Sequence, residues 1–517
     1  MKWSSRGATT SLFGYSLLMV FLFGGALEAA AQSASTFNAT SSMITPRFGH
    51  TSTLLPDGRV LIAGGYVSCG VGPLPAACIP AAWAELYDPA TASFTGAGNM
   101  STISPVGGLL LPNDKVLFAE GIFTGVPARL ELYDPSSGEF KIAEASTSMS
   151  AVFSAALLND GRVLLNGYGR SGTAAEIYDP ATGNLAPVPN WPTNLWYNLI
   201  LSVLPDGRVL LDNPAFFDPS TGTFTYTNDV VAEAFDDTAP TANSLLDGKE
   251  LFTGGALTIG GRVNRAELFD PTDASISRPG NMWFVRALHT ATLLPNGEVL
   301  VAGGASGYNF ATHAALVTDS AEIYDPVTAT FSLTGSMTTS RLSHAAVVLK
   351  NGQVLVTGGQ ATSPPEGPVR LFAGRSTAEL YTPDTLIPAP VLFSLSGDGS
   401  GQGAIWRAST GQIASASNPA AIGEVLSMYT TSLAENSVIA PQVAVGGLPA
   451  EVLSFAPAPQ YPGYYQVNFR VPFGVAAGPV VPVRLSYIGR PSNEVTIGVF
   501  LLSPGVAVFA NSIQQDK

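Results

Sequence analysis

Charged side chains are scarce in this chain of 517 residues, and basic ones are fewer than acidic ones. Lys, Arg, Asp and Glu make up 12% of the sequence, and 24 basic against 38 acidic residues give a net charge of −14. Nucleic-acid phosphates and anionic membrane surfaces both attract proteins through Lys and Arg. The composition therefore argues against nucleic acid or a membrane surface as the partner, although mild acidity by itself identifies no ligand.

Cysteine and histidine are also rare, with two and four copies. Cys69 and Cys78 lie nine positions apart in one expected loop, which predicts a local disulfide in an oxidising compartment. A metal or redox site would need further ligands near this pair, and the sequence has none there. We therefore expect a structural disulfide, no metal and no cofactor.

Motifs of several common enzyme classes are missing. The sequence has no Gly-x-Ser-x-Gly nucleophile elbow, no Walker loop and no His-Glu-x-x-His zinc motif. The Ser-x-Asp-x-Gly-x-x-Trp turns of sialidases are absent as well. No catalytic residue can be named from the sequence.

Long apolar runs are confined to the N-terminus. Lys2 and Arg6 precede an apolar stretch over residues 11–27, and small residues follow up to Ala31. This is the pattern of a secretory signal peptide, so residues 1–31 are expected to be removed; an uncleaved membrane anchor is the alternative. We expect the mature protein to be secreted, periplasmic or held at the cell surface, with no membrane contact after cleavage.

Glycine (54 copies) and proline (39 copies) are plentiful, and many of them mark a repeated hairpin. The segment Thr290–Gly304 shows its form: an apolar run, an Asn-Gly pair and a second apolar run. Asn-Gly between apolar runs predicts a tight hairpin in which both turn residues take φ > 0. The equivalent pairs are Asp57-Gly58, Asn113-Asp114, Asp160-Gly161, Asp206-Gly207, Asp247-Gly248, Asn296-Gly297 and Asn351-Gly352.

A second turn follows each hairpin. Asp-Pro suits a type I turn because Asp favours its first position and proline presets φ at the next. From Tyr87 to Tyr381 this turn advances 294 residues in six intervals, a mean of 49. A repeat near 50 residues with four strands in each copy is typical of a β-propeller of the kelch kind. The turns are Tyr87-Asp-Pro89, Tyr133-Asp-Pro135, Tyr178-Asp-Pro180, Phe217-Asp-Pro219, Phe269-Asp-Pro271, Tyr324-Asp-Pro326 and Tyr381-Thr-Pro383.

Two further patterns strengthen the resemblance to kelch repeats. Gly-Gly follows the second strand of four repeats, and Arg-x-x-His opens three of them, while repeats two to four lack both. The resemblance implies an all-β, seven-bladed propeller. The glycine pairs are Gly64-Gly65, Gly254-Gly255, Gly303-Gly304 and Gly358-Gly359, and the Arg/His pairs are Arg47/His50, Arg286/His289 and Arg341/His344.

The two ends of the repeat region are expected to meet in one blade. The seventh repeat lacks its last strand, and Thr36–Met43 matches Thr330–Met337 of the sixth repeat. The mature N-terminus is therefore expected to supply the missing outer strand, over about residues 35–43, which removes an open sheet edge. This places the propeller at residues 32–386 and a linker at 387–390.

A different pattern follows the linker. Short alternating segments at intervals of about ten residues predict a small β-sandwich over residues 391–505, with a tail over 506–517. Gly446–Val452 and Gln466–Pro472 resemble the Ig/TIG-like domains of secreted bacterial proteins of unknown function. This resemblance carries no catalytic residue.

Function is expected on the propeller face that carries the connections between second and third strands. These loops are long in blades one, five, six and seven, at residues 66–83, 256–265, 305–320 and 360–377. Those blades are neighbours in a closed ring of seven, so their loops would form one wall, and binding residues concentrate on loops held by a rigid scaffold. The candidate ligand-binding residues are Trp191, Trp196, Tyr197, Tyr308, Asn309, His313, Asp319, Arg370 and Arg375.

Two groups of residues have structural alternatives. Trp191, Trp196 and Tyr197 would suit sugar rings by stacking, or they fill the gap left by the short loop of blade four. The histidines of the three Arg-x-x-His segments are expected to stabilise blades rather than to bind a ligand. The same is expected of the glutamate that precedes six of the seven second turns, at Glu85, Glu131, Glu176, Glu267, Glu322 and Glu379. His313 is the one histidine outside the repeat pattern.

The whole architecture is similar to galactose oxidase and its copper-radical relatives. That resemblance implies copper held by tyrosines and two histidines, one of them from the C-terminal domain, and a cysteine cross-linked to a tyrosine. Here no histidine follows His344 and both cysteines lie in blade one, so the copper site does not carry over.

We therefore predict a secreted, monomeric, non-catalytic binding or scaffold protein whose partner is an extracellular glycan or protein. A hydrolase, lyase or epimerase that acts on carbohydrate in the propeller mouth is the alternative.

Overall fold

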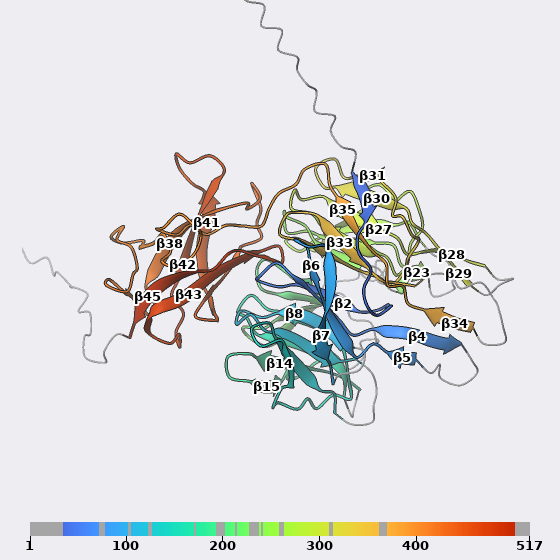
Figure 1. The fold of residues 1–517 in the computed structure, drawn as a ribbon, viewed down its shortest axis with the longest axis horizontal. Helices are drawn as coiled ribbons and strands as arrows, with labels where there is room; N and C mark the ends of the chain where they lie inside the picture. The colour runs from blue at the N-terminus through green and yellow to red at the C-terminus, as the bar shows by residue number, and fades with distance from the viewer. Residues whose placement is uncertain are drawn as a thin grey trace, which may run out of the picture. The chain divides into compact units, whose positions relative to one another are not determined.

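The computed structural model describes residues 35–71, 78–101, 105–121, 127–169, 172–192, 202–211, 215–226, 237–238, 241–257, 263–309, 314–360 and 370–501. Every regular element in these stretches is a β-strand, so the fold is all-β (Figure 1). These residues include no helix that is both long and apolar enough to cross a membrane. The expected signal peptide, residues 1–31, and the expected tail, 506–517, lie outside the described residues.

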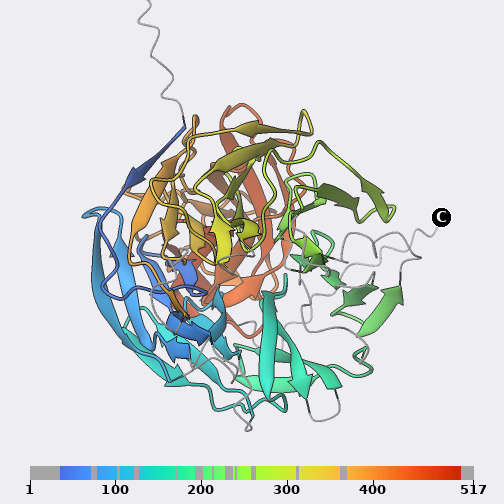
Figure 2. The same ribbon diagram turned by 90° about the vertical axis from the view of Figure 1, so that its right-hand side faces the viewer.

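Seven four-stranded antiparallel sheets account for residues 36–382. Their innermost strands contact one another in chain order, and the last of them contacts the first, so the sheets close into a ring, as in a β-propeller (Figure 2). The blades, each from its inner to its outer strand, are as follows. Blade one is β2 (Thr51–Leu54), β3 (Val60–Ala63), β6 (Trp83–Asp88) and β7 (Ser93–Asn99); blade two is β8 (Pro105–Leu110), β9 (Val116–Glu120), β10 (Leu130–Asp134) and β11 (Glu139–Ile142); blade three is β12 (Ala151–Leu157), β13 (Val163–Gly169), β14 (Gly172–Asp179) and β15 (Asn184–Pro187); blade four is β16 (Ser202–Val203), β17 (Val209–Leu211), β18 (Ala215–Asp218) and β19 (Thr223–Tyr226). Blade five is β21 (Thr241–Ser244), β22 (Glu250–Thr253), β24 (Ala266–Asp270) and β25 (Ser275–Ser277); blade six is β26 (Thr290–Leu293), β27 (Val299–Ala302), β30 (Ala321–Asp325) and β31 (Thr330–Leu333); blade seven is β32 (Ala345–Val348), β33 (Val354–Thr357), β35 (Ala378–Thr382) and β1 (Thr36–Ala39).

The core lies between the blades. The second strand of six blades is buried at every position, as in β3, β27 and β33, and in blade three only Tyr168 of β13 is less than fully buried. A neighbouring blade covers each of its two faces, which explains why these strands read as continuous apolar runs rather than as an alternation. One core cluster, for example, joins Leu300 of blade six to Val354 of blade seven.

The hairpin turns differ from the expectation in one detail. Gly58 has a φ of 94°, but the preceding Asp57 does not have a positive φ. The Gly58 N–H donates to the Leu55 carbonyl at 2.9 Å, and the Leu55 N–H donates to the Arg59 carbonyl at 2.8 Å. These bonds define a type I turn followed by one residue in the left-handed conformation, the three-residue hairpin loop. The expectation of two residues with φ > 0 is wrong, and the same pair of bonds occurs in all seven repeats.

The ring closes in blade seven. Strand β1, from the N-terminal side, pairs antiparallel with β35, and Phe37 stands opposite Tyr381. Their rings pack with centroids 4.8 Å apart, and the Ser35 hydroxyl donates to Asp384 at 2.9 Å. One blade is therefore built from both ends of the repeat region, which leaves no unpaired strand edge at the closure.

The Arg-x-x-His segments join neighbouring blades. Arg47 forms a fully buried ion pair with Glu85 of its own blade, with 2.8 Å between Nη2 and Oε1. Its carbonyl accepts the N–H of Gly359 in blade seven at 2.9 Å, and the Nε2 of His50 lies 2.9 Å from the hydroxyl of Thr357 in the same blade. The segments that open blades six and seven make equivalent contacts. The expected structural role of these histidines agrees with this geometry.

The glycine pairs make this junction possible. A Cβ atom on Gly358, whose φ is 61°, would lie 2.4 Å from the carbonyl oxygen of Arg47, closer than real Cβ atoms approach backbone. Glycine is required because the backbones of two blades meet here without a side chain between them.

Residues after the linker form two further sheets around one core. A four-stranded sheet has the order β36-β38-β42-β41, and a second sheet has the order β37-β45-β43-β39-β40, with β44 paired to β43. Leu426, Val467 and Phe469 of the first sheet pack with Val483 and Ile497 of the second. The strands are β36 (Ile405–Arg407), β37 (Ala420–Ala421), β38 (Val425–Thr431), β39 (Gln442–Val445), β40 (Leu448–Ala450), β41 (Val452–Pro457), β42 (Tyr464–Arg470), β43 (Gly478–Tyr487), β44 (Arg490–Pro491) and β45 (Val495–Phe500).

Candidate functional site

The long connections between second and third strands contain small sheets of their own. In blade one, β4 (Tyr66–Val71) and β5 (Cys78–Pro80) form a hairpin, and β34 (Arg370–Ala373) of blade seven pairs with β4. In blade six, β28 (Ala305–Asn309) pairs with β29 (Ala314–Val317), and in blade five β23 (Ala256–Leu257) pairs with β20 (Asp237–Thr238). These elements lie on one side of the ring in Figure 1. We call them the long-loop face.

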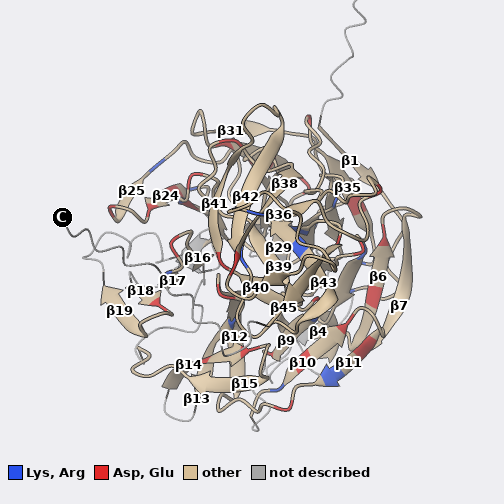
Figure 3. Cartoon of the chain, turned by 90° about the vertical axis from the view of Figure 1, so that its left-hand side faces the viewer, with Lys and Arg blue, Asp and Glu red and all other residues tan. Residues whose placement is uncertain are grey.

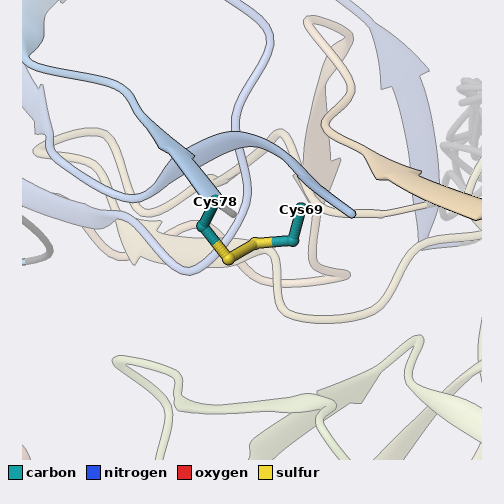
Figure 4. Close-up of a disulfide and its surroundings, with 2 residues drawn as sticks. All are labelled: Cys69 and Cys78. Atoms are coloured by element: carbon teal, nitrogen blue, oxygen red, sulfur yellow. A yellow bond between two sulfur atoms is a disulfide. The ribbon is translucent and has the colours of Figure 1, made fainter. Parts of the chain in front are cut away.

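A disulfide fixes one part of the long-loop face. Cys69 on β4 and Cys78 on β5 are bonded to each other and stand opposite in the hairpin register (Figure 4). Cys69 also stands opposite Phe372 of β34. The expected loop-local disulfide is confirmed, and the covalent link holds the strand that ties the loop of blade one to the loop of blade seven.

Trp191 does not belong to a ligand site. Its side chain is only 6% exposed and lies in the core between blades three and four, edge-on to Phe217 and Phe224. A buried ring has no face left for a sugar. For this residue the ligand-binding expectation is wrong, because its side chain is part of the core between blades three and four.

Arg375 and Asp319 are the candidate residues whose side chains the structure describes at the long-loop face. Arg375 is half-buried, and its backbone forms a β-bridge with Arg47, while the preceding Gly374 forms one with Gln360. The Nε atom of Arg375 is buried without a hydrogen-bond partner among the described residues. Asp319 is exposed, and its carbonyl accepts the N–H of Met337 at 2.9 Å. One cation and one anion are thus available on this face.

The remaining candidates are placed by backbone alone or not at all. Tyr308 and Asn309 are on β28, and Arg370 is the first residue of β34. Trp196, Tyr197 and His313 lie outside the described residues. Their contribution to a site remains a prediction.

The described histidines do not fit a metal site. Burial, and then the charges of Arg47 and Arg341, lower the pKa of His50 to about 3, so its imidazole stays neutral. Its Nε2 is occupied by Thr357 and the neighbouring guanidinium groups would repel a cation. Within the described ranges no group of three or more His, Cys, Asp or Glu side chains could hold a metal ion. These residues therefore do not match a copper ligand set.

One buried carboxyl was not singled out by the sequence reasoning. Glu250 of β22 is fully buried and stands opposite Ser244, whose hydroxyl donates to Oε1 at 2.5 Å, while Oε2 has no partner among the described residues. Burial raises the pKa of Glu250 to about 7. The signal was available, because the other six repeats have valine at this position: Val60, Val116, Val163, Val209, Val299 and Val354.

Two hollows on the described surface lie away from the long-loop face. A groove of about 580 Å³ lies between blades two and three, beside Lys141 and Asn184, and one of about 330 Å³ lies between blades three and four, beside Pro187 and Phe217. In Figure 3 the positions of Lys and Arg, in blue, are scattered over the elements rather than gathered on one of them.

The ring of four-stranded sheets with added loop sheets defines a β-propeller protein. No protein-family model and no curated protein matches the sequence. Among solved structures, a fungal alcohol oxidase of the AA5 family in complex with copper is similar, with 15% identity over 90% of this chain and 100% of that chain and a TM-score of 0.56. The structure of YjhT matches with 12% identity over 66% of this chain and 96% of that chain and a TM-score of 0.41. At this level of identity the first likeness supports the fold alone.

Proposed function

We propose that this chain is a secreted, non-catalytic binding protein that takes an extracellular glycan or protein on the long-loop face. The observation that carries the proposal is the pairing of β34 with β4. Two loops from different blades, 300 residues apart in sequence, form one small sheet that a disulfide reinforces. Loops fixed in this way lose little conformational entropy when a ligand binds.

Arg375 is the side chain best suited to contribute to this binding. It precedes Ser376 in the segment that leaves the β34 sheet, and the residue as a whole is only half-buried. Arginine presents five N–H donors in a planar fork, which suits carboxylates, hydroxyls and backbone carbonyls. A glycan or a peptide could each use such a donor.

The test compares wild type with Arg375→Gln on a glycan array and against extracellular proteins immobilised one at a time. Arg208→Gln is the matched control, because Arg208 lies at an Asp-Gly turn and pairs with Asp206 there. The expected result is a ligand whose affinity falls about tenfold or more in Arg375→Gln only. Turnover of a polysaccharide by the wild type, lost in Arg375→Gln, would instead favour the carbohydrate-active enzyme.

A further inference from the structure

A second surface with the chemistry of a binding site lies on the C-terminal domain. One face of the four-stranded sheet β36-β38-β42-β41 packs into the core through residues such as Leu426 and Phe469. The opposite face carries Trp406, Tyr429, Gln466 and Asn468, none of which belongs to the core. The exposed face of an antiparallel sheet usually carries polar residues, so the large aromatic rings of Trp406 and Tyr429 on this face need an explanation.

The aromatic rings form a continuous row. The centroids of Trp406 and Tyr429 lie 4.8 Å apart, and those of Tyr429 and Tyr461 lie 5.6 Å apart. Tyr461 is 53% exposed, although the loop that carries it is held by hydrogen bonds between Ala458 and Tyr464 and between Tyr461 and Ala458. The row therefore presents apolar ring surface to solvent from fixed positions.

Neutral hydrogen-bonding groups stand beside this row. Asn468 Oδ1 accepts from Ser427 at 2.5 Å and from Gln466 at 3.2 Å, and Asn468 Nδ2 donates to Ser454 at 2.9 Å. The cross-strand register puts Trp406, Ser427, Asn468 and Ser454 in one line across the sheet. Because the amides orient each other, they would lose little side-chain entropy on binding. The side-chain amide oxygen of Gln466, Oε1, has no hydrogen-bond partner among the described residues and can accept a further hydrogen bond.

The face is also almost uncharged. Arg470 is the charged residue of β42 on this side, and Glu451 already pairs with it at 2.9 Å. A polar protein or an ionic ligand would find no charge to complement. A sugar chain matches the surface better, because its C–H faces can lie on aromatic rings while its hydroxyl groups bond to amides and hydroxyls between them. An open sheet face also suits an extended polymer more than a small ligand, which a concave pocket would enclose.

We infer that this aromatic face of the C-terminal domain binds a neutral polysaccharide. The site is separate from the long-loop face of the propeller and does not depend on it.

The experiment is native gel electrophoresis of the full chain through gels that contain soluble mixed-linkage β-glucan, xylan or galactomannan. Sedimentation with insoluble cellulose and chitin accompanies it. Tyr461→Ala and Trp406→Phe test the face, since Tyr461 is in an exposed loop and phenylalanine preserves an apolar ring at position 406. Phe473→Ala is the matched control, because Phe473 is 78% exposed in the loop after β42 but outside the row.

We expect the wild type and Phe473→Ala to be retarded or sedimented by at least one neutral polysaccharide. Tyr461→Ala should weaken this binding about tenfold, and Trp406→Phe should weaken it measurably. Arg375→Gln should bind polysaccharide as the wild type does. This variant therefore distinguishes binding at the aromatic face from binding at the long-loop face of the propeller. Failure of the wild type to bind any of the five probes, or equal binding by Tyr461→Ala, would overturn the inference. A protein partner lost on Tyr461→Ala, with no polysaccharide bound, would overturn it too and assign the face to protein.

Discussion

Glu250 gives a quantitative prediction for the pH dependence of stability. The carboxyl lies in blade five at a position where the other six blades have valine, and burial raises its pKa from 4.5 to about 7. The native protein therefore binds this proton more tightly than the unfolded chain does. The stabilisation is complete below pH 4.5 and is lost as the pH rises through 7.

The magnitude follows from the size of the shift. The difference of 7 − 4.5 = 2.5 units corresponds to about 3 kcal/mol, since one unit is worth about 1.4 kcal/mol. Most of this change falls between pH 5 and pH 8, where the wild type should lose about 2.5 kcal/mol of unfolding free energy to this group. Glu250→Gln keeps the size of the side chain and cannot ionise, so it should escape that loss.

The assay is denaturant unfolding followed by intrinsic fluorescence at pH 5 and pH 8. The free energy of Glu250→Gln relative to wild type should rise by about 2 to 3 kcal/mol between the two pH values. Glu139→Gln removes the same charge from a side chain that is 60% exposed and should show no such change. A difference between Glu250→Gln and wild type that is the same at both pH values would refute the reasoning.

Three other perturbations test the junctions and the long-loop face. Gly358→Ala should lower the free energy of unfolding by about 1–3 kcal/mol more than Gly138→Ala does, measured by thermal or denaturant unfolding. Both residues have a positive φ, but an added Cβ atom clashes with backbone only at Gly358. Equal losses of unfolding free energy in the two variants would contradict this. Burial, and then a nearby arginine, lower the pKa of His289 to about 3, so its stabilising effect is present above pH 6.5 and falls by about 1.4 kcal/mol per pH unit on acidification towards 3. His289→Gln should therefore flatten the acid limb of the stability curve, and an unchanged limb would count against a neutral, buried imidazole. Replacing Cys69 and Cys78 by serine removes the disulfide that closes a short loop and should lower the stability of that loop by about 3 kcal/mol. The loss should appear as faster amide hydrogen exchange in β4 and β34. Exchange at the wild-type rate would mean that strand pairing alone stabilises this part of the long-loop face.

The propeller could be predicted from the sequence because each repeat contains the turn residues and apolar segments that determine its own hairpins. The Asp-Gly and Asp-Pro turns recur at a regular interval, and the apolar second strands lie between them. The exact turn type was less accessible. The pair Asp57-Gly58 indicates a reversal, but whether one or two residues take φ > 0 depends on the hydrogen-bond register of the flanking strands, which the dipeptide does not contain.

The candidate site was less predictable because exposure is a property of the whole fold. Trp191 lies in an unpatterned segment beside asparagine and proline, which is typical of a loop, yet its side chain is buried against Phe217 and Phe224 of blade four. Tyr429 and Gln466 alternate with core residues in ordinary strands, so only the cross-strand register shows that they adjoin. Glu250 is the opposite case, since comparison of the repeats with one another would have revealed it.

The repeated and unrepeated residues of this chain divide by role. Arg47 and Glu85, like the equivalent pairs of blades six and seven, form buried ion pairs inside the ring, and such pairs are costly to break and out of reach of a ligand. Arg375 departs from the repeat and is only half-buried, so part of its side chain is open to solvent at the long-loop face. Every blade of a propeller packs against its neighbours in the same way. A polar group that occurs in one blade and is not required for that packing is therefore the best guide to function. By this criterion the long-loop face, rather than the repeated histidines, is where a ligand of the propeller should be sought, and the aromatic face is the corresponding surface of the C-terminal domain.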